Sequence, residues 1–420
     1  MFFQNLQKVL RQNIREYGMY IALFVIMLIF TFSTDGIFIS SRNLSNLLNQ
    51  TGYIAVLAVG MTLVIVIRHV DLSVGFLAGF LGAAAAILLV FGLNIPVAEA
   101  ICNLAPAFFS ETCTLRLLPP LPVYVVIPIV LGLGILAGLA TAFPVAQLGI
   151  PSFVASLAGW LIYRGALLLV TEGTGTIVIA DEAFNAIGNG YIPDFPEMGF
   201  LPEVHKLTLL IGLIAIVLFI VSEISNRRKK QAYNFEVLPM DIFVLKLIFV
   251  SAVVGGVTWV LAGYNGLSWT MVIMLVVVGV YHFVTSQTVL GRHVYAIGGN
   301  PEAAELSGIS VKRLTYVVFG SMGLLSALSG ILFTSRLQSA TTTAGTLFEL
   351  DAIAAAYVGG VSAAGGVGKV TGSIIGALVM TSLTSGMNLM GVGIAYQYIV
   401  RGAVLAAAVI FDVTTRRSGK

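Results

Sequence analysis

Long apolar runs are the feature that most constrains how this chain can fold. Residues 72–93 and 123–143 are almost continuously apolar, and about 20 such residues let an α-helix cross the hydrocarbon core of a bilayer. Strands of a membrane barrel would instead alternate apolar and polar residues. Because charged residues make up only 10% of the sequence, the chain could not cover its surface in water. The sequence therefore predicts an all-α, polytopic membrane protein.

About twelve apolar runs can be separated, and we expect them to form one membrane domain over residues 1–420. The runs cover residues 18–33, 53–67, 72–93, 123–143, 153–171, 207–221, 242–262, 269–285, 314–333, 352–361, 370–389 and 394–411. The run at 352–361 is too short to cross alone, so ten to twelve transmembrane or re-entrant helices are expected. Gly-interrupted segments at 75–82 and 359–376 could mark an internal inverted repeat. Tight helix packing is the alternative explanation for these glycines.

Basic residues of the short loops predict the orientation of the chain. Such residues stay on the cytoplasmic side, and they gather before the first run, at 227–230, around 292–313 and at the C-terminus. Both termini are therefore expected in the cytoplasm. The predicted cytoplasmic loops are 224–239 and 287–313, and the predicted outer loops are 94–122 and 172–206.

The remaining titratable and sulfur groups give little indication of enzyme chemistry. Cys102 and Cys113 share one outer loop, where a disulfide could persist, but spacing cannot show geometry; a bridge and two free thiols are equal alternatives. The segment AAGGVGKV at 363–370 resembles a phosphate-binding loop but lacks its first Gly and its final Ser or Thr. No metal or cofactor on this chain and no nucleic-acid partner are expected.

Two interruptions of the apolar sequence could mark a solute pathway. Arg68, His69 and Asp71 separate two runs, and Glu349 and Asp351 open the short run. Ionisable groups are costly in lipid and usually face a cavity, a partner or the interface. The alternative is an ordinary cytoplasmic turn in which Asp71 or Ser73 caps the following helix.

A polar segment at 291–308 predicts a short cytoplasmic helix. Asn300 has the character of an N-cap, Pro301 suits the first helical position, and Glu302 suits the first turn. Gly308 is a typical C-terminal stop. Such a helix is not needed to cross lipid and suits docking into a groove on another protein; a surface linker is the alternative.

Several motifs resemble the permeases of ABC importers of the ribose, xylose and galactose class. They are spread over residues 44–411 in the order of that family. The motifs are AVGMT at 58–62, VDLSVG at 70–75, GIPSF at 149–153, RG at 164–165, YAIGGNPEAAELSG at 295–308, ELDAIAA at 349–355 and GMNL at 386–389. Arg68 and His69 depart from the small residues that many members carry before the DLSVG pattern.

The resemblance implies an inner-membrane homodimer that imports a monosaccharide by alternating access. A separate ATPase subunit would carry ATP and Mg²⁺, and a periplasmic sugar-binding protein would deliver the sugar. Coupling to the ATPase is implied for Arg292, His293, Asn300, Pro301, Glu302, Ala303, Glu305 and Gly308. Motif-borne candidates for the substrate pathway are Asn49, Asp71, Phe76, Trp160, Glu349, Asp351 and Asn388. The longer layout favours xylose or another pentose or aldohexose; an ion-coupled transporter and a nucleoside or signalling-sugar permease are the rivals.

Overall fold

The computed structural model describes residues 14–96, 114–172, 175–196, 204–235 and 237–418. Cys102 and Cys113 lie outside the described residues, so neither alternative for them is tested.

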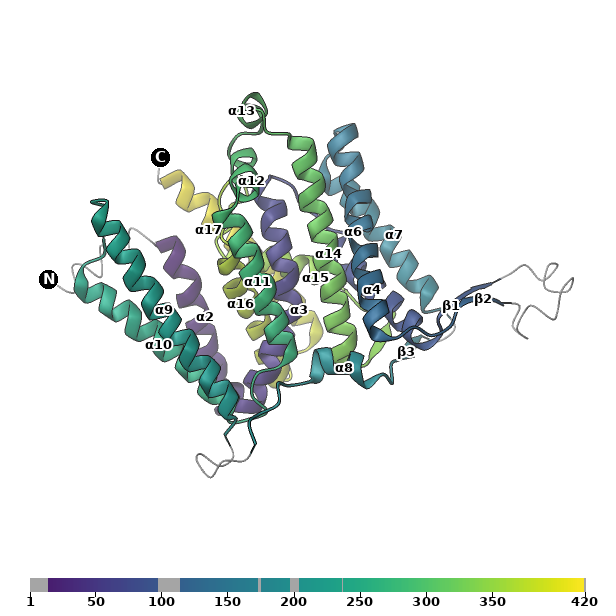
Figure 1. Ribbon diagram of the computed structural model, residues 1–420, viewed down its shortest axis with the longest axis horizontal. Coiled ribbons are helices and arrows are strands. Elements are labelled where there is room, and N and C mark those ends of the chain that lie inside the picture. Colours follow the sequence, from purple (N-terminus) through teal and green to yellow (C-terminus); the bar gives the residue numbers. More distant parts are fainter. Residues whose placement is uncertain (1–13, 97–113, 173–174, 197–203, 236, 419–420) are drawn as a thin grey trace, which may run out of the picture. The chain divides into compact units, whose positions relative to one another are not determined.

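Helices account for almost all of the regular structure (Figure 1). The helices are α2 (Ile14–Ser33), η1 (Ile37–Ile39), α3 (Ser41–Val66), α4 (Val74–Val90), α6 (Val123–Leu148), α7 (Ser152–Val170), α8 (Glu182–Asn189), α9 (Lys206–Ala232), α10 (Met240–Ala262), α11 (Trp269–Gln287), α12 (Val289–Gly299), α13 (Pro301–Leu306), α14 (Val311–Leu337), α15 (Phe348–Val358), α16 (Val370–Leu389) and α17 (Ile394–Ser418). The strands are β1 (Leu93–Pro96), β2 (Thr114–Leu118), β3 (Thr176–Val178) and β4 (Ser339–Thr341).

The prediction of an all-α, polytopic membrane protein is confirmed. In the described part of the chain, 9 helices are long and apolar enough to cross a membrane, and two apolar helices, Gly18–Ser33 and Val74–Val90, are shorter. The run predicted to be too short to cross alone forms α15, which has only 11 residues.

The expected loops contain more structure than hydropathy reveals. β1 and β2 pair within 94–122, β3 and α8 fall within 172–206, and α12 and α13 fall within 287–313. Of the basic loop expected at 224–239, residues up to Ala232 continue α9 as helix. Lys and Arg are good helix formers, and cations in the last turn interact favourably with the helix dipole.

Contacts divide the chain into two compact units. Unit 1 comprises Met1–Leu48, Tyr191–Ser268 and Ser382–Gly393; unit 2 comprises Asn49–Gly190, Trp269–Thr381 and Ile394–Lys420. Within unit 1, two side-chain contacts join the C-terminal part of α9 to the N-terminal part of α10. Lys246 Nζ lies 2.8 Å from Glu223 Oε2, and the Arg227 guanidinium lies 4.7 Å from the centroid of the Phe243 ring.

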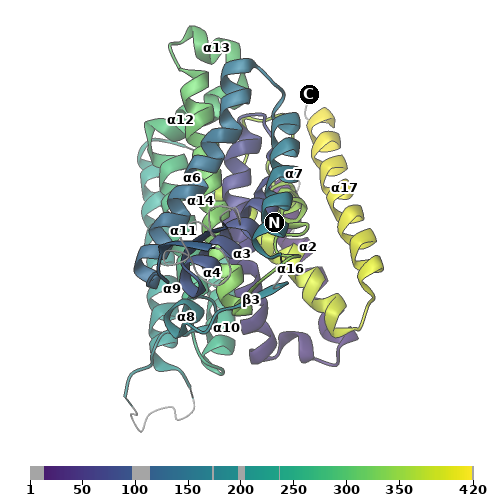
Figure 2. The same cartoon turned by 90° about the vertical axis from the view of Figure 1, so that its right-hand side faces the viewer.

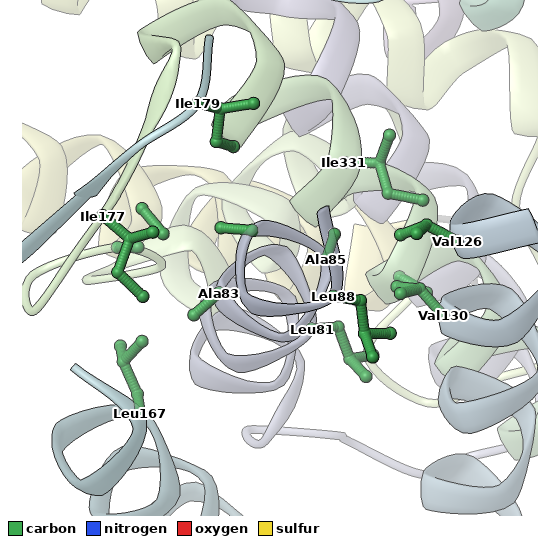
Figure 3. Packing of buried hydrophobic residues seen from close by; sticks show 14 of the residues in the cluster. Leu81, Ala83, Ala85, Leu88, Val126, Val130, Leu167, Ile177, Ile179 and Ile331 are labelled. Carbon is green, nitrogen blue, oxygen red and sulfur yellow. The ribbon is translucent and has the colours of Figure 1, made fainter. Parts of the chain in front are cut away.

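Helix α14 forms the centre of unit 2, where it packs against α6 and α4. A buried cluster of mostly aliphatic side chains fills the space around α4. Figure 3 shows Leu81 and Leu88 of α4 pointing toward Val126 and Val130 of α6, with Ile331 of α14 beside them.

Glycines allow these helices to approach backbone to backbone. A Cβ on Gly134 of α6 would overlap with the carbonyl oxygen of Gly323 of α14, and a Cβ on Gly330 would overlap with the carbonyl of Ala78 of α4. In a membrane, helix association depends on such close van der Waals packing because lipid tails are as apolar as the side chains.

After α14 the chain leaves helical geometry and returns along α4. β4 pairs with β3 in antiparallel register, and residues 342–347 then form successive turns before α15 begins. Gly345, with φ 80°, lies against Gly75 so closely that a Cβ on Gly345 would overlap with the Gly75 carbonyl. Non-helical backbone beside a membrane helix is tolerated where it is buried in protein or lines a water-filled cavity.

We expect Gly134→Ala to destabilise the protein by about 1–3 kcal/mol, because the added methyl forces apart the packed backbones of α6 and α14. Gly132→Ala is the matched control on the same helix, since nothing lies within 4 Å of the added atom, and it should be neutral or stabilising. Thermal unfolding of the purified protein in detergent measures both variants. Equal melting temperatures for the two would contradict the close-packing account.

Candidate functional site

The predicted cytoplasmic helix is α13, and its ends are formed as the sequence predicts. Asn300 Oδ1 accepts hydrogen bonds from the backbone N–H groups of Glu302 at 3.1 Å and Ala303 at 3.2 Å. Pro301 occupies the first helical position. Gly308 has φ 85° and donates its N–H to the Glu305 carbonyl at 2.9 Å, which closes the helix.

The segment before α13 is also helical. Arg292 and His293, two of the predicted coupling residues, belong to α12, which starts at the N-cap Thr288. Val294 and Ile297 are buried and hold α12 against the body of unit 2. Figure 1 and Figure 2 both show α12 and α13 at the end of unit 2 where α14 begins.

The outer face of α13 combines two acids with one large apolar side chain. Ala304 is buried, whereas Glu302, Ala303 and Glu305 are exposed. Leu306 is 91% exposed. Sequence analysis missed Leu306; its only signal was its place as the last residue of a capped helix. A fully exposed leucine at the end of a polar helix is suited to a pocket on a partner protein.

Three of the predicted pathway residues meet in unit 2, although they come from three different helices. The rings of Phe76 in α4 and Trp160 in α7 are perpendicular, with centroids 4.8 Å apart. Trp160 Nε1 donates a hydrogen bond to Glu349 Oε1 of α15 at 3.1 Å. The Arg164 guanidinium lies 4.9 Å from the Phe76 ring centroid. We call Phe76, Trp160, Arg164 and Glu349 the aromatic–carboxylate cluster.

Glu349 has an unused acceptor in this cluster. Only 5% of the residue is exposed, and Oε2 has no hydrogen-bond partner among the described residues. The carboxylate lies over Gly75, where any Cβ would overlap with Oε2. A buried acceptor without a partner is unfavourable unless a ligand or water satisfies it.

The non-helical residues 342–347 border the aromatic–carboxylate cluster. Arg164 donates a hydrogen bond to the Thr342 carbonyl, so this arginine has a partner within unit 2. Thr343 and Thr346 of the same stretch are exposed. The Thr346 hydroxyl donates a hydrogen bond to the Thr343 carbonyl at 2.7 Å, within the same stretch. Sequence analysis did not single out these threonines.

Asp71 stabilises the turn before α4 and does not cap the helix, whose N-cap is Ser73 without a side-chain cap bond. Its Oδ1 accepts hydrogen bonds from the Ser73 N–H at 2.9 Å and the Ser73 hydroxyl at 2.6 Å. Val70 N–H donates to Ser152 Oγ at 3.1 Å, which attaches the same turn to the start of α7.

The other pathway candidates occupy separate places. Asn49 is buried in α3, and Asn388 is exposed in the part of α16 that belongs to unit 1. Asp351 forms an ion pair with Arg401 of α17, with Oδ2 and Nη1 3.3 Å apart. That pair borders a cavity of about 210 Å³ with an otherwise mainly apolar lining, formed by α15, α16 and α17.

Comparison with known proteins decides the class of this chain. Residues 43–409 match the family described as branched-chain amino acid transport system, permease component. The chain belongs to this permease family. It is a transport component rather than an enzyme.

The permease has relatives that match it along almost its whole length. It is 38% identical over 405 residues to the xylose transport system permease protein XylH of Escherichia coli, covering 96% of this chain and 93% of that protein. The XylH protein of Haemophilus influenzae is 37% identical, with 96% and 98% covered. The ribose import permease protein RbsC of Haemophilus influenzae is 31% identical, with 94% and 93% covered. No solved structure matches the chain.

Within the described residues of the permease, no group of three or more His, Cys, Asp or Glu side chains could hold a metal ion.

Asp194 fixes the segment that precedes α9 to the start of that helix. Its carboxylate accepts hydrogen bonds from the N–H groups of Lys206 at 2.9 Å and Leu207 at 2.8 Å, and His205 Nδ1 lies 3.6 Å away. Desolvation acts to raise the pKa of Asp194, but these N–H donors and His205 outweigh it and lower the pKa below its ordinary value.

Because the pKa of Asp194 is lower in the folded protein than in the unfolded chain, its stabilisation is complete above about pH 4 and disappears as the pH falls through the folded pKa. Asp194→Asn should therefore cost about 0.5 kcal/mol at pH 7 and almost nothing near pH 3. Thermal unfolding at the two pH values measures this, with Glu172→Gln as the control at another exposed carboxylate. A deficit that persists undiminished at pH 3 would argue against the charged cap.

Proposed function

We propose that this chain is the membrane-spanning subunit of an ATP-driven importer for a monosaccharide, with xylose as the leading substrate. The observation that carries the proposal is the 38% identity to a xylose permease over 96% of the chain. The ribose permease, at 31% identity, supports pentoses as the substrate class.

In this proposal the chain lies in a bacterial inner membrane with both termini in the cytoplasm. The clusters of Lys and Arg in the short loops support this orientation. A second copy of the permease would complete the translocation path, and a periplasmic sugar-binding protein would dock on the outer regions 94–122 and 172–206. ATP and Mg²⁺ would be bound by a separate ATPase subunit, which α13 would contact.

Transport needs no covalent chemistry on the sugar. ATP-driven closure of two ATPase subunits would move α13 of each permease and change which side of the membrane the path opens to. The aromatic–carboxylate cluster supports a transient contact in that path, because Phe76 and Trp160 provide apolar ring surface and Glu349 Oε2 provides a free acceptor. A few polar groups suffice, since tight binding would retard release.

The first test is a pull-down of the tagged chain from detergent-solubilised membranes, followed by ATPase assays in nanodiscs. We expect an ATPase subunit to be captured, with activity raised by the sugar-loaded binding protein. Xylose, ribose, glucose, a nucleoside and leucine, the last suggested by the family description, should be compared. A solitary chain whose uptake resists vanadate and collapses with an ion gradient would overturn the proposal in favour of a secondary transporter.

Leu306 tests the docking surface. Leu306→Asp should reduce capture of the ATPase subunit at least about tenfold, because a charge replaces an apolar group that is 91% exposed in the free chain and would be buried in the partner. Leu306→Met and Ser307→Asp are the controls: the first keeps an apolar side chain and the second adds the same charge at the next position. If Leu306→Asp captures as much ATPase subunit as the unsubstituted protein, α13 is not part of the interface.

Glu349 tests the pathway. Glu349→Gln keeps an acceptor for Trp160 but replaces the second carboxylate oxygen with a donor group, so sugar uptake should fall about tenfold, the loss of one buried hydrogen bond. Uptake into proteoliposomes of the reconstituted complex measures the change. Glu182→Gln, on an exposed position of α8, is the matched control. Unchanged uptake by Glu349→Gln would show that Glu349 does not contact the transported sugar.

A further inference from the structure

The turn that ends α3 places an arginine in a conformation that usually belongs to glycine. Arg68 has φ 66°, a left-handed geometry that non-glycine residues rarely adopt. Its N–H donates to the Ile65 carbonyl at 2.9 Å, and the N–H of His69 donates to the Val64 carbonyl at 3.0 Å. We call residues 67–73, which connect α3 to α4, the elbow.

The Arg68 side chain reaches the end of α12. Its Nε donates a hydrogen bond to the Gly298 carbonyl at 2.8 Å, and Nη2 donates to the Gly299 carbonyl. These are the last two residues of α12, so the guanidinium satisfies carbonyls that have no partner within the helix and interacts with the negative end of its dipole. The next residue, Asn300, is the N-cap of α13.

The backbone around this contact is too close for independent movement. A Cβ on Gly298 would overlap with the Val66 carbonyl and with Gly366. Gly366 N–H donates to the same Val66 carbonyl at 2.9 Å, and the hydroxyl of Tyr295 in α12 donates to the Gly368 carbonyl at 2.7 Å. The end of α3, the end of α12 and residues 365–368 therefore form one joint.

The glycine-rich segment of this joint is also held from its other side. It follows helix α15 rather than a strand, unlike a phosphate-binding loop. Asp412 of α17 accepts hydrogen bonds from the Ala363 N–H at 3.1 Å and from the Ser362 hydroxyl at 3.3 Å. These hydrogen bonds to α17 thus hold the segment in place against the end of α12.

The elbow leads directly to the aromatic–carboxylate cluster. Asp71 and Ser73 of the elbow start α4, and the first turn of α4 carries Gly75 and Phe76, which contact Glu349 and Trp160. A displacement of α13 that reaches Arg68 would therefore be passed, through the elbow, to the residues that border the cluster.

We propose that Arg68 is a positioning residue that links the movement of α13 to the elbow between α3 and α4. The proposal rests on the function proposed above, because it takes α13 as the contact with the ATPase subunit. Arg68 is itself exposed, so its removal leaves no cavity. Its side chain holds the elbow to the end of α12 and contributes little to the overall stability of the protein.

Arg68→Gly is the decisive variant, since it removes the guanidinium while suiting the left-handed backbone. In the free permease, hydrogen exchange at the N–H groups of Asn300 and Ala304 should become at least about threefold faster. In the reconstituted complex, sugar transported per ATP hydrolysed should fall at least about fivefold, with capture of the ATPase subunit unchanged. Arg68→Lys, which keeps the charge but has one donor centre, should be intermediate. Lys312→Ala is the control for loss of one exposed cation.

Two results with Arg68→Gly would overturn the proposal. Normal coupling with Arg68→Gly, whatever the exchange rates, excludes the link, and loss of the captured ATPase subunit would make Arg68 a docking residue instead. If the complex of the unsubstituted permease shows no sugar-dependent ATPase activity, the proposed function is refuted independently of Arg68. Exchange in the free permease would then still decide whether Arg68 restrains α13.

Discussion

Direct contact between the backbones of α14, α6 and α4 is the constraint on which unit 2 depends. Gly134, Gly323 and Gly330 leave no room for a side chain where these helices meet. Lipid tails are as apolar as the side chains, so no hydrophobic effect drives these helices together. Van der Waals contact between closely packed backbones must therefore stabilise their association. The buried cluster around α4 and the placement of β4 both follow from this packing.

The close packing also supports an irregular segment next to a membrane helix. Residues 342–347 can lie against α4 because Gly75 and Gly79 present bare backbone to them. Their turns bring Glu349 to Trp160, although these residues are far apart in the sequence. The same arrangement leaves one carboxylate oxygen buried without a partner in the described part of the protein.

Hydropathy was sufficient to predict the membrane helices, because each apolar run can be recognised from its own residues. The capped helix at Asn300–Gly308 could also be predicted from the sequence, since capping depends only on residues close in the chain. The aromatic–carboxylate cluster was only half predictable: Phe76, Trp160 and Glu349 were named from motifs, but nothing local shows that three separate helices bring them together. The contact of Arg68 with α12 depends on a left-handed turn and on tertiary packing, so it had no signal beyond an unusual residue before a known pattern.

The segment 342–347 combines a fixed backbone with exposed side chains. Its backbone is locked against α4 by Gly75, Gly79 and Gly345, so substitutions at those positions disturb the frame itself. Thr343 and Thr346 are exposed, and Thr346 also supports the backbone by donating to the Thr343 carbonyl at 2.7 Å. Substitution at exposed Thr343 thus changes a surface group, whereas substitution at the glycines changes the path of the backbone.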